Sequence, residues 1–142
     1  MTKKRLLLAL VLLLSGAAGF FIFHPKAGEA PELTLIQTRL VRVETPRANE
    51  VVKSPLAVRG QARGPWFFEG SFPVRLLDDQ GKELAVTPAQ AQGEWMTEDF
   101  VPFKATLEFT TNAKTGTLVL EKDNPSGLPE QANELRFPVI FK

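Results

Sequence analysis

GQARGPWFFEGSF, residues Gly60–Phe72, is a run too rich in glycine and aromatic residues for an ordinary loop. Its glycines indicate backbone at positive φ or in close approach to other groups, and its four aromatic side chains carry a large apolar area. Two interpretations follow: the corner of a β-fold that fills its own core, or a contact surface presented to a glycan or a protein. On the second interpretation Trp66, Phe67 and Glu69 are candidate binding residues.

On both sides of this run, apolar residues recur at every second position, which is typical of half-buried strands. The clearest case is Phe103 to Phe109, where apolar and polar residues alternate. Thr45-Pro46 is expected to end the first strand, and Pro88 to end the fourth. We predict about seven strands, over residues 33–44, 56–60, 72–78, 83–87, 103–110, 117–122 and 135–142.

Short strands separated by turn residues, without helical periodicity after Phe23, indicate an all-β fold. For the roughly 110 residues involved, the leading architecture is an immunoglobulin-like antiparallel β-sandwich. Asp79–Lys82 supplies the Asp and Gly that a hairpin turn needs. Pro138 places the last strand at an edge, or limits it to pairing on one side. We therefore expect one domain, residues 33–142.

The N-terminus has the pattern of a membrane segment. A basic tip, residues 1–5, precedes an apolar run over residues 6–23 that is long enough to span a bilayer as a helix. The positive-inside rule then leaves the tip in the cytoplasm and the domain outside. A cleaved signal peptide is the alternative, with a secreted or periplasmic domain as its product. Residues 24–32 are expected to form a linker.

Composition excludes several classes of function. The chain has no cysteine and one histidine, His24, which lies before the domain, so histidine-based catalysis and thiolate metal sites are excluded there. From residue 33 onward, 13 Lys and Arg face 14 Asp and Glu, a balance that argues against nucleic-acid binding. We expect no cofactor, no metal and no enzymatic activity.

The segment Glu94–Asp99 holds three carboxylates and Trp95, a further candidate binding residue. Its spacing matches no calcium loop, so a solvated loop is the favoured interpretation. A small envelope hydrolase that uses Glu94 and Glu98 is the weakest alternative, since two carboxylates need a fixed separation for glycoside hydrolysis.

Collinear residues along the domain resemble one family: Ser54-Pro55-Leu56, Val58, Gly60, Ala62, Gly64, Trp66–Gly70, Phe72, Asp79, Gly81, Glu94-Trp95, Pro102-Phe103 and Ser126-Gly127. They resemble the bacterial immunoglobulin-like domain named from spore-germination proteins, over about Val41 to Lys142. The resemblance implies an extracytoplasmic β-sandwich that serves binding or adhesion in the cell envelope, and it supplies no catalytic residue.

Two non-enzymatic functions therefore stay open. The first is a binding module, anchored through residues 6–23, that contacts an envelope protein or a cell-wall glycan. The second is a structural spacer or assembly component whose aromatic residues all lie in the core.

Overall fold

Alternating apolar and polar residues form β-strands along most of the domain. The computed structural model describes residues 34–142, with side chains from Thr38 onward. The described part holds nine strands and two single-turn 3-10 helices: β1 (Thr34–Gln37), β2 (Val41–Ala48), β3 (Val51–Val52), β4 (Leu56–Arg63), η1 (Gly64–Trp66), β5 (Ser71–Asp78), β6 (Glu83–Ala91), β7 (Phe100–Leu107), β8 (Thr115–Glu121), η2 (Pro129–Gln131) and β9 (Glu134–Phe141).

Within residues 34–142, no helix is both long enough and apolar enough to cross a bilayer. The predicted membrane segment, residues 6–23, and the linker, residues 24–32, lie outside the described residues.

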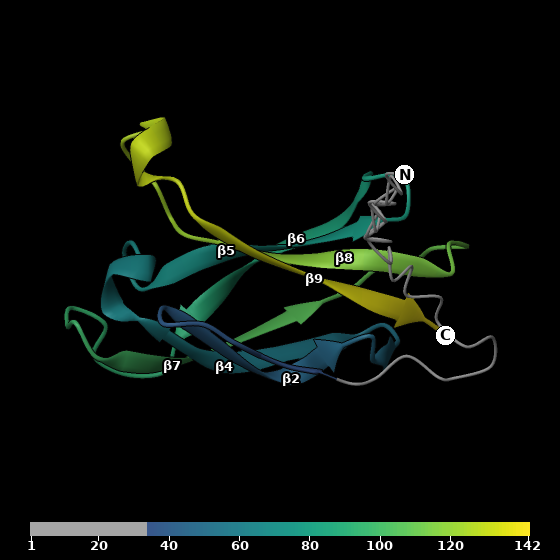
Figure 1. Ribbon diagram of the computed structural model, residues 1–142, viewed down its shortest axis with the longest axis horizontal. Helices are drawn as coiled ribbons and strands as arrows, with labels where there is room; N and C mark the ends of the chain where they lie inside the picture. Colours follow the sequence, from purple (N-terminus) through teal and green to yellow (C-terminus); the bar gives the residue numbers. More distant parts are fainter. Residues whose placement is uncertain (1–33) are drawn as a thin grey trace, which may run out of the picture.

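The strands form two layers (Figure 1). β1, β2, β4 and β7 make one layer, and β6, β5, β8, β9 and β3 make the other, in these orders. The layers are joined by a short contact between β6 and β7, where Gln90 pairs with Lys104 and Ala91 with Phe103. The fold is thus all-β, as predicted, and the two layers are consistent with an immunoglobulin-like sandwich.

The opposite side of the sandwich is closed by the chain itself. β2 ends at Ala48, and after Asn49, at φ 64°, the chain crosses to the second layer as β3. The Asn49 N–H donates to the Pro138 carbonyl at 2.8 Å, and β3 then pairs in parallel with the end of β9. Hydrogen bonds therefore tie the layers together along both sides.

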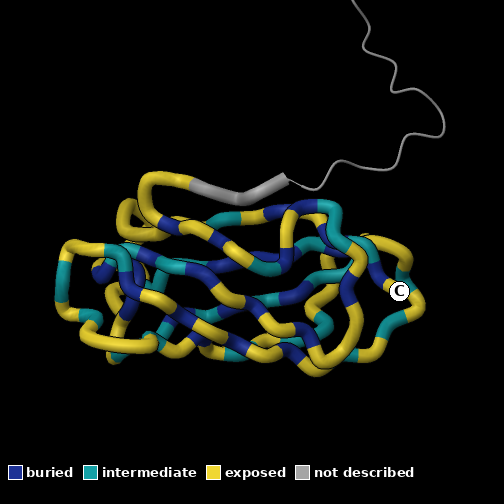
Figure 2. Tube along the Cα trace, turned by 90° about the horizontal axis from the view of Figure 1, so that it is seen from below, coloured by how far each residue is buried: buried dark blue, intermediate teal, exposed yellow. Residues whose placement is uncertain are grey.

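Strand alternation places one face of each layer in a shared core, and Figure 2 shows buried and exposed positions alternating along the trace. The predicted inward residues of β7, Phe103, Ala105 and Leu107, are buried, and Phe137 and Val139 of β9 are buried as well. All the buried side chains within the described residues are apolar.

The predicted first strand is wrong in two respects, because it is a hairpin and it continues past Pro46. The Thr38 hydroxyl oxygen accepts the N–H groups of Leu40 and Val41, at 3.1 and 2.9 Å, which turns the chain between β1 and β2. β2 then runs through Pro46 to Ala48 beyond a register shift near Val43. This turn is formed by the Thr38 side chain and hardly interrupts the alternation of apolar residues. The sequence pattern therefore does not reveal the turn.

The prediction that Pro88 ends a strand is also wrong, since β6 continues to Ala91. Pro88 pairs with Pro73 of β5, and β6 meets β7 only from Gln90 onward. A proline without an N–H is tolerated where a strand has a partner on one side only.

Candidate binding surface at one end of the sandwich

The glycine- and aromatic-rich run turns the chain between the two layers. Pro65 lies in the first turn of η1, and the segment then makes a two-residue turn in which Phe68 and Ser71 exchange backbone hydrogen bonds of 2.9 and 3.1 Å. Glu69 and Gly70, at φ 50° and 77°, are its central residues. Positive φ at both central positions is the geometry that matches the twist of a β-hairpin.

Gly64 fixes this corner to the β6–β7 loop. Its N–H donates to the Asp99 carbonyl at 3.1 Å. A Cβ at Gly64 would lie 1.7 Å from the Thr97 carbonyl oxygen and 2.5 Å from that of Trp95, so only glycine permits this approach. The run and the acidic segment, 30 residues apart in the chain, therefore meet at one end of the molecule.

Phe72 is the centre of a buried aromatic cluster. Its ring lies edge-on to Phe67, Phe103 and Trp66, with centroid distances of 5.2, 4.9 and 6.4 Å. Edge-to-face pairs of this kind stabilise beyond the area that they bury. Trp66 and Phe67, at 3% and 5% exposure, belong to the core, as the core-filling interpretation expects.

The other two predicted site residues lie nearer the surface. Glu69 is exposed at the tip of its turn, and Trp95 is half-buried on the β6–β7 loop. A Cβ on Gly70 would lie 3.3 Å from the Trp95 indole nitrogen, so the turn and this indole are adjacent. The structure thus brings Glu69 and Trp95 to the same end, above the buried Trp66 and Phe67. Binding by any of the four stays a prediction.

Three adjoining hollows surround Pro65 at this end, which we call the η1 end. One, of about 380 Å³, lies between η1 and the β6–β7 loop. A second, of about 280 Å³, lies between η1 and the β1–β2 turn, and a third, of about 450 Å³, lies between η1 and the β8–β9 connection. In Figure 1 these connections gather at the end of the sandwich away from the C-terminus.

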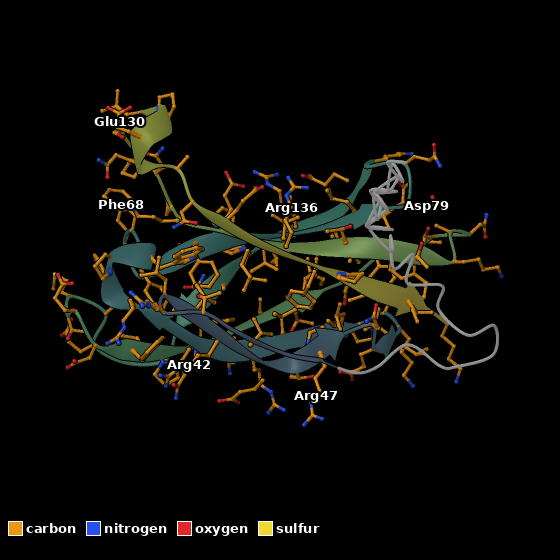
Figure 3. The ribbon with its side chains drawn as sticks, viewed as in Figure 1. Arg42, Arg47, Phe68, Asp79, Glu130 and Arg136 are labelled. Atoms are coloured by element: carbon orange, nitrogen blue, oxygen red, sulfur yellow. The ribbon has the colours of Figure 1, made fainter. Side chains whose placement is uncertain are left out.

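Exposed apolar side chains concentrate around these hollows. Leu40, Phe68, Met96 and Leu128 are 42%, 43%, 73% and 49% exposed, and each lines one of the three. They are four of the six large apolar side chains exposed among the residues whose burial is described. Figure 3 shows Phe68 at this end of the molecule, below the connection that carries Glu130. A gathering of this kind is typical of an interaction site.

Trp66, which lines the second hollow, has a buried polar atom. The Trp66 indole N–H is buried and has no acceptor within the described residues. Arg63, Glu98 and Lys122 surround the same hollow. An unpaired buried donor costs ~1–3 kcal/mol.

Two of the three carboxylates of the acidic segment accept hydrogen bonds within their own loop. Glu94 accepts the Met96 N–H at 3.0 Å, and the Asp99 carboxylate accepts the Thr97 hydroxyl at 3.4 Å. Glu94 and Glu98 are both exposed. Across residues 34–142, no group of three or more His, Cys, Asp or Glu is placed to hold a metal ion.

The exposed apolar residues at this end, Leu40, Phe68, Met96 and Leu128, were not among the binding residues predicted from sequence. Trp66 and Phe67 are neighbours and are both buried, because the 3-10 turn replaces strand alternation there, and Phe68 is the ring left outside. The pair Gly64-Pro65, which starts that turn, is the signal that could have separated them.

The profile of one family, the immunoglobulin-like domain of bacterial spore germination, matches residues 40–127. The chain belongs to this family. The resemblance read from sequence is thereby confirmed, although the match ends before β9, which completes the second layer. Neither a curated protein nor a solved structure gives a significant match. The family is one of immunoglobulin-like domains, and the match gives no positive evidence of enzymatic activity.

Proposed function

We propose that this chain is a non-enzymatic, extracytoplasmic binding module of the bacterial cell envelope, and that its η1 end contacts an envelope protein. The observation that carries the proposal is the concentration of exposed Leu40, Phe68, Met96 and Leu128 around three adjoining hollows. Apolar anchors beside pockets, with polar groups at the rim, are the usual composition of a protein interface. The family adds an association with germination to this proposal.

The four residues predicted from sequence take different parts in this proposal. Trp95 and Glu69 lie at the surface and contact the partner directly. Trp66 and Phe67 support the surface from below as members of the buried aromatic cluster.

The position of β1 leaves the η1 end accessible. Thr34 pairs with Ala48 at the far end of β2, whereas the β1–β2 turn at Leu40 belongs to the η1 end. A chain anchored through residues 6–23 therefore enters the domain away from the proposed contact surface, which supports display of that surface to a partner.

Photo-crosslinking tests the proposal. A photoreactive residue at Met96, in the full chain in its native membrane, is expected to capture one defined envelope protein. The same residue at Val86, which is 49% exposed on β6, is the matched control and should capture nothing or a different set. The same capture from both positions, or none from Met96, Phe68 and Leu128, would contradict the η1 end as the contact surface.

A structural spacer is the second candidate, because the burial of Trp66 and Phe67 gives the aromatic run a sufficient role in the core. It predicts that Met96→Ser and Leu128→Ser leave assembly of the envelope complex unchanged. The hydrolase alternative has least support, since Glu94 and Glu98 are exposed on a loop; it predicts turnover of peptidoglycan fragments, which the proposal does not.

A further inference from the structure

The outer face of the β2–β4–β7 layer carries an excess of positive charge. Its outward positions include one carboxylate, Glu44, and five cations. Figure 3 shows Arg42 and Arg47 on the side of this layer that faces away from the second layer. We call the five cations the basic face: Arg42 and Arg47 of β2, Arg59 and Arg63 of β4, and Lys104 of β7.

These cations are close together and lack carboxylate partners. Arg59 and Lys104 are directly opposite in the register of β4 and β7, an arrangement of like charges that destabilises a sheet. The guanidinium carbons of Arg42 and Arg63 lie 3.9 and 4.0 Å from the centroid of the Phe100 ring. Among residues 38–142, no ion pair joins any of the five to a carboxylate.

In the second layer, the outward-facing arginines are paired with carboxylates. Arg75 donates to Glu83 at 2.6 Å and to Glu121 at 3.0 Å, and Arg136 donates to Glu134. The near balance of charge from residue 33 onward therefore conceals an asymmetry, with one layer internally paired and the other not. Unpaired like charges on one face are a reason to expect an anionic partner for that face.

We propose that the basic face rests on a membrane surface rich in anionic phospholipid headgroups. The face is the outer side of a β-layer, so it presents its charges to an extended surface. β1, through which the chain enters the domain, is the edge strand of the same layer. If residues 6–23 span the bilayer, residues 24–33 reach at most about 35 Å at ~3.5 Å per residue, which keeps this layer near the headgroups.

The size of the effect follows from charge. One basic residue near an anionic membrane contributes ~1 kcal/mol, a factor of about five in the ratio of the docked to the undocked state. Replacing three of the five should lower this ratio on the order of 100-fold. Salt should weaken docking in the same direction, since the screening length falls from about 10 Å at 0.1 M to about 3 Å at 1 M.

The absence of cysteine from the sequence allows a direct test on the full chain. A fluorophore at Thr106→Cys, exposed on β7 within this face, is read in vesicles whose headgroups carry a quencher. Quenching is expected in vesicles that contain phosphatidylglycerol and not in neutral phosphatidylcholine vesicles, and high salt should reverse it. A fluorophore at Gln80→Cys, in the β5–β6 turn of the other layer, should stay unquenched in both.

Two charge-matched variants complete the experiment. Arg42→Gln/Arg59→Gln/Lys104→Gln should abolish the quenching, whereas Lys82→Gln/Lys114→Gln/Lys142→Gln, which removes three exposed cations elsewhere, should keep it. Both sets should remain folded, because all six side chains are exposed. In the first set, loss of the Arg42 contact with Phe100 is opposed by relief of the repulsion between Arg59 and Lys104. Equal quenching in neutral and anionic vesicles, or equal loss in both variants, would overturn the proposal. Binding of soluble inorganic polyphosphate without quenching by anionic vesicles would overturn it too, and would assign the face to a soluble phosphate polymer.

Discussion

At the scale of single residues, the shape of the η1 end depends on having a residue without a Cβ at position 64. Gly64 has no Cβ, and its backbone therefore approaches the carbonyl groups of Trp95 and Thr97 more closely than any other residue would allow. This contact sets the position of the β6–β7 loop, and with it that of Trp95 and Met96 beside η1. A residue inside the aromatic run thus controls the shape of a hollow on the surface.

Gly64→Ala should therefore lower the free energy of unfolding by ~2–3 kcal/mol, as for overpacking of a filled site. The thermal midpoint should fall by about 10 °C or more. Gly93→Ala is the matched control, because a Cβ at Gly93 has no heavy atom within 4 Å; its effect should stay within ~0.5 kcal/mol. Calorimetry on both variants decides the matter, and equal midpoints would show that the loop gives way at little cost.

At the scale of elements, strands are predictable where one face is buried and the ladder is regular. β7 and β9 satisfy this condition, and a strand was predicted at each from alternation alone. Two features were not predicted. The β1–β2 turn depends on the Thr38 side chain, and the continuation of β6 through Pro88 depends on which side of β6 has a partner strand. The family match ends at residue 127, before β9, whereas the alternation of apolar residues predicts a strand there.

β9 should be as necessary to the fold as the matched strands. Phe137 is 3% exposed and pairs with Leu118 of β8, so Phe137→Ala should cost ~3–5 kcal/mol through the cavity that it leaves. Its neighbour Arg136 is exposed and paired with Glu134, and Arg136→Ala should leave the urea midpoint close to that of the parent, as expected when a surface ion pair is lost. Urea denaturation of the two variants measures both effects. If Phe137→Ala destabilised the protein less than Arg136→Ala does, β9 would lie outside the cooperative core.

At the scale of the whole molecule, the layers share one core and are tied along both sides. The β6–β7 contact joins residues 14 apart, at Gln90 and Lys104, and the β3–β9 contact joins Val51 to Ile140. Neither contact leaves a local trace in the sequence, because each depends on where distant strands end. Fold class could therefore be predicted, whereas the closure of the sandwich and the gathering of hollows at one end could not.

Closure along both sides, around a single buried cluster, predicts that the two layers unfold together. The Trp95→Phe variant makes Trp66 the only tryptophan, and its indole reports on the η1 end of the core. Its fluorescence and the far-ultraviolet circular dichroism of all strands should then give the same urea midpoint, since Trp66 contacts Phe72 of the second layer while η1 continues β4 of the first. An earlier fluorescence transition would mean that the η1 end opens on its own, and the hollows would then be features of a separable cap.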